Sequence, residues 1–368
     1  MVRYLSTVLA LLALCHGVQT GAQTKVSQQP FGKLKDGKAV EIYTLFDGKI
    51  EARIMTYGGV IVSLKTPDRA GKMADITLGF YNLAQYLAPN PHFGALIGRY
   101  GNRIGKGHLV VAGKAYQLAL NNGPNTLHGG TEGFDRKLWT AKAIPNGVEL
   151  TYVSKDMEEN FPGTLTAVVH YTLEGGALKI DYTATTNKET VVNLTNHAYF
   201  NLAGEGSGDV LKQEMQISAS RFTPVDDGLI PTGELRAVKG TPFDFSKPTA
   251  IGAHINDDDD QLKLGHGYDH NFVIDSKGGM TLAAVAHDPA SGRVMEVRTT
   301  EPGVQFYTGN FLDGTLKGKS GTLYKQRYAF CLETQHFPDS PNKPDFPSTV
   351  LKPGHKYHTV TEYKFSAR

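Results

Sequence analysis

Five short polar clusters hold the residue types that could do chemistry in this chain. They interrupt text that otherwise has the pattern of apolar strands, and they lie at residues 98–104, 125–130, 193–202, 268–272 and 331–339. Their histidines and carboxylates could transfer protons near neutral pH, and their arginines and amides could hydrogen-bond a polar ligand. A fold that brought the five clusters together would build a small-molecule site.

The third cluster gives the clearest evidence for a ligand cavity. In an extended segment alternate side chains share a face, so Thr195, His197 and Tyr199 would lie together, with Leu194, Ala198 and Phe200 on the other face or its edges. A polar stripe on a buried strand costs several kcal/mol unless it is paired or hydrated. A ligand cavity would account for the stripe, and a histidine satisfied within the core is the alternative.

The other clusters also have ordinary structural explanations. His128 could be a surface residue of a turn, Asp269 could cap a turn or pair with an arginine, and Glu333 could face solvent from a strand. A metal site is not expected. The chain has no His-Glu-x-x-His run and no cysteine pair, and Gly267 disfavours the helix that would align His266 with His270.

The first 22 residues have the pattern of a secretory signal peptide. Arg3 precedes an apolar run from Leu5 to Leu14 that is too short to cross a bilayer, and Thr20-Gly21-Ala22 resembles a cleavage site. We expect a secreted or periplasmic protein, without stable membrane association, whose mature chain begins near Gln23. Cys331 is then its one cysteine, which excludes an internal disulfide and predicts a small buried hydrophobic residue.

Composition excludes several other classes. The 368 residues include 40% hydrophobic and 20% charged ones, which is enough for a large core, and the formal net charge is only +2. Without a basic arm or a basic helix face, a nucleic-acid partner is not expected. No linker rich in proline and serine divides the chain, so we predict a single domain over 23–368, present as a monomer or weak dimer.

The elements that must position the clusters are predicted to be strands. Runs at Thr164–Leu173 and Ala177–Thr185 flank the turn Glu174-Gly175-Gly176, and apolar and polar residues alternate along the second run. Similar runs occur at Gly59–Leu64, Val148–Val153, Met280–Ala286, Arg293–Thr299 and Tyr357–Phe365. The best helix candidate is Asn82–Leu87, and the acidic run Asp257–Asp260 is expected to be a solvated loop. This pattern predicts an all-β antiparallel sandwich or barrel with few short helices.

Together and in this order, the five clusters resemble the aldose 1-epimerase (galactose mutarotase) family. The similarity runs from about Val40 to the C-terminus and is most specific at Asn193–Leu202 and Leu332–Phe337. The resemblance implies a large antiparallel β-sandwich of the galactose mutarotase-like supersandwich type, with an open sugar cleft. It also implies an isomerase that interconverts the α and β anomers of free hexoses such as glucose and galactose without a cofactor.

The resemblance assigns roles to individual residues. Glu333 matches the general base and His197 the general acid, acting as carboxylate and imidazolium on the C1 hydroxyl and the ring oxygen. Positions that hold the sugar are matched by Asn102, Arg103, His128, Tyr199, Asp269 and Gln305. Relatives often carry small apolar residues where this chain has Tyr100-Gly101, so both Arg99 and Arg103 are candidates to reach the substrate, and Arg103 is favoured.

Three alternatives remain at this point. A hexose-6-phosphate 1-epimerase would need extra cationic residues for the phosphate, and the chain shows no clear cluster beyond Arg99 and Arg103. A glycoside hydrolase could use Glu333 and Asp269 as its acid pair. A non-catalytic sugar-binding module would need neither Glu333 nor His197.

Overall fold

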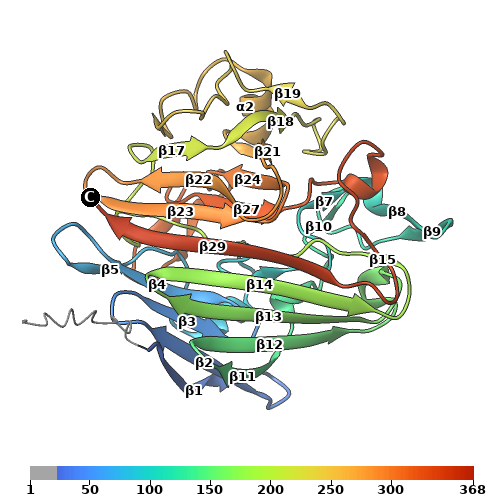
Figure 1. Ribbon diagram of the computed structural model, residues 1–368, viewed down its shortest axis with the longest axis horizontal. Helices are drawn as coiled ribbons and strands as arrows, with labels where there is room; N and C mark the ends of the chain where they lie inside the picture. The colour runs from blue at the N-terminus through green and yellow to red at the C-terminus, as the bar shows by residue number, and fades with distance from the viewer. Residues whose placement is uncertain (1–22) are drawn as a thin grey trace, which may run out of the picture.

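A nine-stranded antiparallel sheet forms the front layer of the molecule (Figure 1). The computed structural model describes residues 23–368, so the predicted signal peptide lies outside the described residues. The sheet includes the hairpin of β13 (Leu165–Glu174) and β14 (Ala177–Thr186), whose turn contains Gly175 and Gly176, both with positive φ. Its other strands are β11 (Thr140–Ile144), β12 (Gly147–Ser154), β17 (Glu214–Ile217), β20 (Thr249–Ala250), β22 (Thr281–His287), β23 (Arg293–Thr299) and β29 (Tyr357–Ala367).

Two five-stranded sheets complete the layers. The N-terminal meander contains β1 (Lys25–Lys33), β2 (Ala39–Phe46), β3 (Glu51–Met55), β4 (Ile61–Pro67) and β5 (Met73–Asp75). The other sheet, in the order β19-β18-β21-β24-β27, contains β18 (Ala219–Thr223), β19 (Arg236–Ala237), β21 (Asp269–Ile274), β24 (Gly303–Tyr307) and β27 (Cys331–Gln335).

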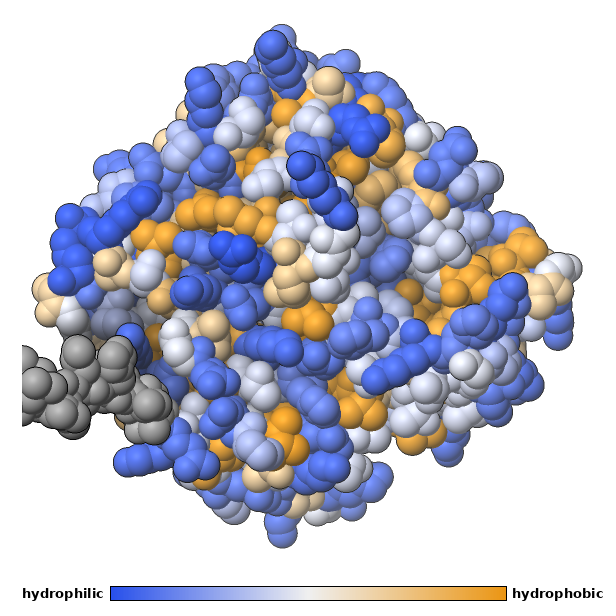
Figure 2. Space-filling view, viewed as in Figure 1, coloured by the Kyte–Doolittle hydropathy of each residue, from blue (hydrophilic) through white to orange (hydrophobic). Residues whose placement is uncertain are grey.

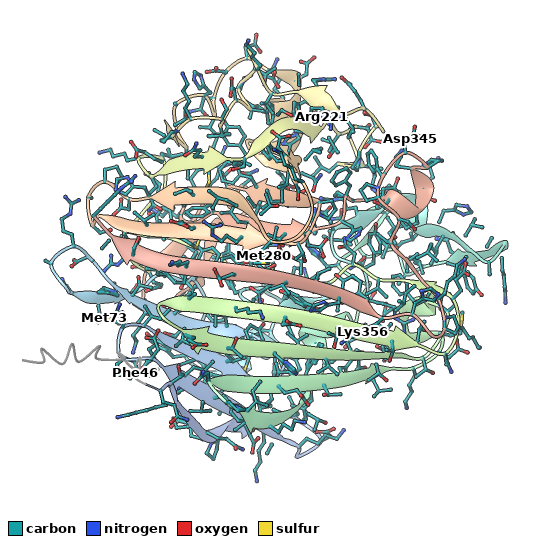
Figure 3. All side chains as sticks on the ribbon, viewed as in Figure 1. Phe46, Met73, Arg221, Met280, Asp345 and Lys356 are labelled. Atoms are coloured by element: carbon teal, nitrogen blue, oxygen red, sulfur yellow. The ribbon has the colours of Figure 1, made fainter. Side chains whose placement is uncertain are left out.

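One hydrophobic cluster connects the three sheets. It includes Leu45 of the meander, Ile180 of the nine-stranded sheet and Phe306 of the third sheet, all fully buried. Side chains extend from all elements of the ribbon (Figure 3), and hydrophilic residues cover most of the face seen in Figure 2, with hydrophobic ones in small groups between them. Among the described residues, no helix is both long and apolar enough to span a membrane.

Short elements make up the rest of the fold. Ten strands pair in twos: β6 (Leu96–Ile97) with β16 (Thr195–Asn196), β7 (Arg103–Ile104) with β10 (Thr126–Leu127), β8 (His108–Val111) with β9 (Lys114–Gln117), β15 (Thr190–Val191) with β28 (Val350–Leu351), and β25 (Asp313–Lys317) with β26 (Leu323–Lys325). In residues 23–368 the α-helices are α1 (Leu83–Leu87) and α2 (Asp260–Gly265). Four 3₁₀ turns lie at Gly105–Gly107, Phe134–Arg136, Glu158–Asn160 and Ser340–Asn342.

The all-β sandwich with few short helices is confirmed, and two local expectations hold only in part. The acidic run is not simply a solvated loop: the Asp259 carboxylate accepts the amide hydrogens of Gln261 and Leu262 and so caps α2, which begins at Asp260. The stripe predicted at Thr195, His197 and Tyr199 holds in part: β16 ends at Asn196 and Thr195 lines no cavity, but His197 and Tyr199 beyond the strand lie side by side.

Candidate active site

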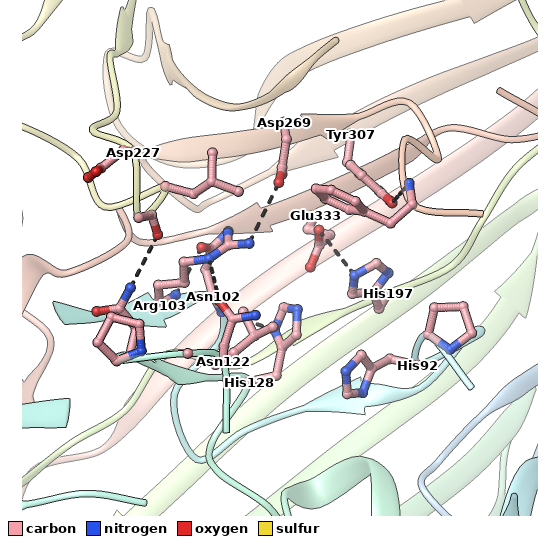
Figure 4. A pocket seen from close by; sticks show the side chains of 18 of the residues that line it. His92, Asn102, Arg103, Asn122, His128, His197, Asp227, Asp269, Tyr307 and Glu333 are labelled. Carbon is pink, nitrogen blue, oxygen red and sulfur yellow. Dashed lines mark hydrogen bonds and ion pairs between the residues drawn. The ribbon is translucent and has the colours of Figure 1, made fainter. Parts of the chain in front are cut away.

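A cavity of about 540 Å³ lies where the five polar clusters meet. Asn102 and Arg103 reach it at β7, His128 follows β10, His197 follows β16, and two carboxylates come from the third sheet (Figure 4). These carboxylates are Asp269, the first residue of β21, and Glu333 in the middle of β27. The sandwich therefore gathers residues that lie more than 200 positions apart in the sequence.

Glu333 and His197 face each other inside this cavity. The distance from His197 Nε2 to Glu333 Oε1 is 3.6 Å, and the two side chains are only 7% and 3% exposed. The other carboxyl oxygen of Glu333, Oε2, is buried without a hydrogen-bond partner among the described residues. A buried carboxyl oxygen without a partner is costly, so it is available for a polar ligand in the cavity.

Burial changes the ionisation expected of this pair. Loss of water raises the pKa of Glu333 well above its usual range; the nearby Asp269 adds to the rise and Arg103 opposes it. Burial, helped by His92, lowers the pKa of His197 to about 3. Both shifts oppose the carboxylate and imidazolium expected from the sequence. Burial thus makes a charge on either member of the pair costly while no sugar is bound.

His128 presents a hydrogen-bond donor to the cavity. Its Nδ1 accepts the backbone N–H of Asn102 at 3.1 Å, so the proton of the neutral ring must sit on Nε2. Burial, with the neighbouring histidines and Arg103, keeps the pKa of His128 well below the usual value. The ring therefore stays neutral, with a fixed tautomer.

This tautomer argues against a metal at the site. Ligand atoms of His128, His197 and Glu333 lie within 4.8 Å of one another. A histidine that binds a metal offers one nitrogen lone pair and donates through its other nitrogen. The Nδ1 of His128 instead accepts a hydrogen bond, so its Nε2 carries a hydrogen and cannot ligate. The three residues thus do not fit a metal ion as arranged, and the absence of a metal in the reaction stays a prediction.

Asp269 lines the cavity and belongs to a small polar network. Its Oδ1 accepts a hydrogen bond from Gln305 Nε2 at 2.7 Å, and its Oδ2 lies 3.8 Å from a guanidinium nitrogen of Arg103. Gln305 pairs directly with Glu333 in the sheet, but it is absent from the residues that line the cavity. The structure therefore places Gln305 where it orients Asp269 rather than where it touches a ligand directly.

The two candidate arginines have different surroundings. Arg103 lines the cavity, where its Nε donates to Asn122 Oδ1 at 3.2 Å. Arg99 is 2% exposed and points away from the cavity, with its guanidinium donating to the carbonyl oxygens of Pro162 and Gly163 at 2.8 Å. Arg99 thus stabilises the loop before β13, and Arg103 is the arginine within reach of a ligand.

Aromatic rings form another wall. Tyr199 stacks on the His197 ring with centroids 5.0 Å apart, and Tyr307 meets the Tyr199 ring edge-on at 5.9 Å. Behind the histidine, the buried thiol of Cys331 lies 3.5 Å from His197 Nδ1. Burial raises the pKa of this thiol, so it stays protonated and unreactive. This agrees with the prediction that Cys331 is a small buried hydrophobic residue.

Sequence reasoning missed several lining residues, chiefly His92, Asn122, Asp227, Tyr307 and Phe311. Most of them lie on loops whose place in space depends on the whole fold. A signal was available for Tyr307, which stands two positions after Gln305 and so shares its strand face.

Comparisons with known proteins agree with this architecture. A family model described as aldose 1-epimerase matches residues 41–364. Galactose mutarotase of Rattus norvegicus is 49% identical over 342 residues, covering 93% of this chain and 98% of the relative. Aldose 1-epimerase of Escherichia coli K12 is 38% identical over 338 residues, covering 90% of this chain and 97% of the relative.

Solved structures show the same fold. A structure of an aldose epimerase homologue from C. elegans superposes with a TM-score of 0.80 at 30% identity, covering 87% of this chain and 96% of that one. Galactose 1-epimerase from Lactobacillus acidophilus NCFM gives a TM-score of 0.81 at 26% identity, covering 93% and 99%. On this evidence, the chain belongs to the aldose 1-epimerase family.

Proposed function

We propose that this protein is an isomerase that interconverts the α and β anomers of free hexoses such as glucose and galactose. The observation that carries the proposal is the 3.6 Å approach of His197 to Glu333 in a cavity lined with hydrogen-bonding groups. One acid and one base within reach of the same small molecule are what ring opening needs. Family membership supports the same reaction.

The reaction moves two protons and needs no redox step. In ring opening, Glu333 takes the proton of the C1 hydroxyl, the bond between C1 and the ring oxygen breaks with its electrons going to that oxygen, and His197 protonates the oxygen. The aldehyde then rotates about the C1–C2 bond. Closure reverses both transfers on the other face, with His197 as base and Glu333 as acid.

Burial opposes the charged forms with which this relay begins. Ring opening begins with a carboxylate and an imidazolium and ends with a protonated Glu333 and a neutral His197. Because burial raises the pKa of Glu333 and lowers that of His197, forming the two charges costs free energy, which hydrogen bonds to the bound sugar would have to offset.

Three neighbours carry groups that suit the sugar hydroxyls. His128 offers an N–H donor, Asp269 offers carboxylate oxygens and Arg103 offers a guanidinium. Among the lining residues of this cavity, Arg103 is the one lysine or arginine, and it faces Asp269. A phosphate would meet carboxylates rather than a cationic cluster, so this set favours a free hexose over a hexose 6-phosphate.

Polarimetry of freshly dissolved α-glucose and α-galactose tests the proposal. The wild type should speed the approach to equilibrium, and Glu333→Gln and His197→Asn should each lower kcat by about 10²–10⁴-fold. The double variant should be little worse than either single one, because the two residues act as a unit. Glu174→Gln, at the exposed end of β13, is the control and should match the wild type.

Near-normal mutarotation by Glu333→Gln would contradict the assignment of the base, and Asp269 would be tested next. Binding of the hexoses by wild type without any change in mutarotation rate would instead support a sugar-binding module. Release of the sugar from an aryl glycoside would support a glycoside hydrolase.

We also propose that the protein is exported to the periplasm or secreted. The support is the arrangement of Arg3, the apolar run Leu5–Leu14 and the small residues ending at Ala22. N-terminal sequencing of the protein from its native host should begin near Gln23. Recovery of the chain with Met1 intact in the cytosol would be incompatible with export.

A further inference from the structure

A third histidine borders the cavity and takes no part in the reaction described above. His92 lies in the loop between α1 and β6, and its ring centroid is 4.9 Å from that of His128 and 5.9 Å from that of His197. Figure 4 shows the three rings together at one end of the cavity, with Glu333 beyond them. A ligand that reaches His197 is therefore also close to His92.

Asp135 holds His92 from outside the cavity. Its Oδ2 lies 2.9 Å from His92 Nδ1, and its side chain, in the 3₁₀ turn Phe134–Arg136, is only 9% exposed. An ionised carboxylate only accepts hydrogen bonds, so His92 Nδ1 must be the donor. In the neutral ring the proton then sits on Nδ1, and Nε2 keeps its lone pair. Within residues 23–368, no hydrogen-bond partner occupies that nitrogen.

His92 and His128 thus have opposite tautomers. The backbone of Asn102 fixes His128 with a donor at Nε2, and Asp135 fixes His92 with an acceptor at Nε2. A sugar hydroxyl both donates and accepts, so adjacent rings of opposite polarity suit a polyol better than two donors would. Because Asp135 holds the His92 ring in one position, His92 can accept a hydrogen bond only from a hydroxyl that the bound sugar presents at that position.

We propose that His92 is a further sugar-binding residue, which accepts a hydrogen bond from one hydroxyl of the aldose while Asp135 fixes its tautomer. This inference deepens the proposed function and rests on it. Asp135 is a positioning residue, since it acts through His92.

His92→Phe is the first test because it removes the acceptor and keeps an aromatic ring against His128 and His197. With glucose or galactose at pH 8, KM should rise by about 3–10-fold, the range expected for one hydrogen bond, and kcat should change less than twofold. His92→Gln places a carbonyl oxygen near the former Nε2 and should restore part of the affinity. It also serves as the informative variant if His92→Phe does not fold.

Monodeoxy sugars separate a contact from a structural effect. For the one sugar that lacks the hydroxyl bound by His92, wild type and His92→Phe should have the same KM, whereas for the others the variant should be worse. Asp135→Asn should raise KM for the same sugars and add nothing in the His92→Phe background. Glu132→Gln, on the exposed side of the same loop, is the control and should leave KM unchanged.

An unchanged KM for His92→Phe with every sugar would overturn the inference. An equal rise for every monodeoxy sugar would also overturn it, since a purely structural role would have that effect. Failure of the proposed function would look different, because then the wild type itself would not speed mutarotation.

Discussion

Burial decides the chemistry of the two central residues at the scale of single side chains. Glu333 and His197 lie 3.6 Å apart with almost no exposed area, and their surroundings favour the neutral form of each. The pair works when it holds one proton in total, because one partner must give a proton as the other takes one. Its pH dependence therefore belongs to the pair and not to isolated model groups.

The two limbs of the pH profile should be assigned in the reverse of the usual order. Below about pH 3, His197 becomes protonated while Glu333 is also protonated, so the pair holds two protons. Above the raised pKa of Glu333, both residues have lost their protons. We expect kcat/KM to be flat between pH 5 and 7, with an alkaline limb that Glu333→Gln abolishes in its residual activity. Polarimetry over pH 4 to 10 measures this. An alkaline limb near pH 6.5 that disappears in His197→Asn would show that the imidazolium is the resting form.

Two arginines four positions apart, Arg99 and Arg103, have different roles in neighbouring short elements. Arg99, before β7, donates to the carbonyls of Pro162 and Gly163 and so ties the β6–β7 segment to the loop that leads into β13. Arg103, in β7 itself, faces Asp269 in the cavity. The first residue should therefore determine stability, and the second should determine activity.

Arg99→Met and Arg103→Met test this division. Arg99→Met leaves buried carbonyl oxygens without donors and should lower the free energy of unfolding by roughly 3 kcal/mol. Arg103→Met should lower kcat/KM strongly while the urea midpoint of unfolding changes little. Urea denaturation and polarimetry on both proteins give the comparison. If Arg99→Met were as stable as the wild type but had lost sugar affinity, the roles would be exchanged.

The length of a strand determines whether its position could be predicted from the sequence. The ten-residue strands β13 and β14 show period-two alternation and were found within one residue at each end. Strands β6, β7, β10 and β16 have two residues each, too few for any period, yet they place Arg103, His128 and His197. The polar clusters made those residues candidates, but their individual roles came only from the family resemblance. His92 has no such motif, and its place depends on Asp135, 43 positions away.

At the scale of the whole molecule, buried neutral histidines make the free energy of unfolding decrease as the pH falls. His270, on β21, is fully buried among aromatic rings that include Phe243, and its Nδ1 accepts the amide hydrogen of Asp269. Burial lowers the pKa of His270 to about 3 in the folded protein. The unfolded chain binds this proton near pH 6.5, so the unfolded state takes up the proton first as pH falls.

His270→Asn should make stability less dependent on pH. The stabilising contribution of His270 is fully present above about pH 6.5, and it is lost at about 1.4 kcal/mol per pH unit as pH falls toward 3. Asparagine keeps an acceptor for the Asp269 amide but does not titrate. Urea unfolding of wild type and variant at pH 7, 6 and 5 should therefore give a smaller slope for the variant, by up to that amount. Buried carboxylates such as Asp269 shift both proteins alike, so the difference isolates His270. Equal slopes would mean that His270 binds a proton in the folded protein as readily as in the unfolded chain.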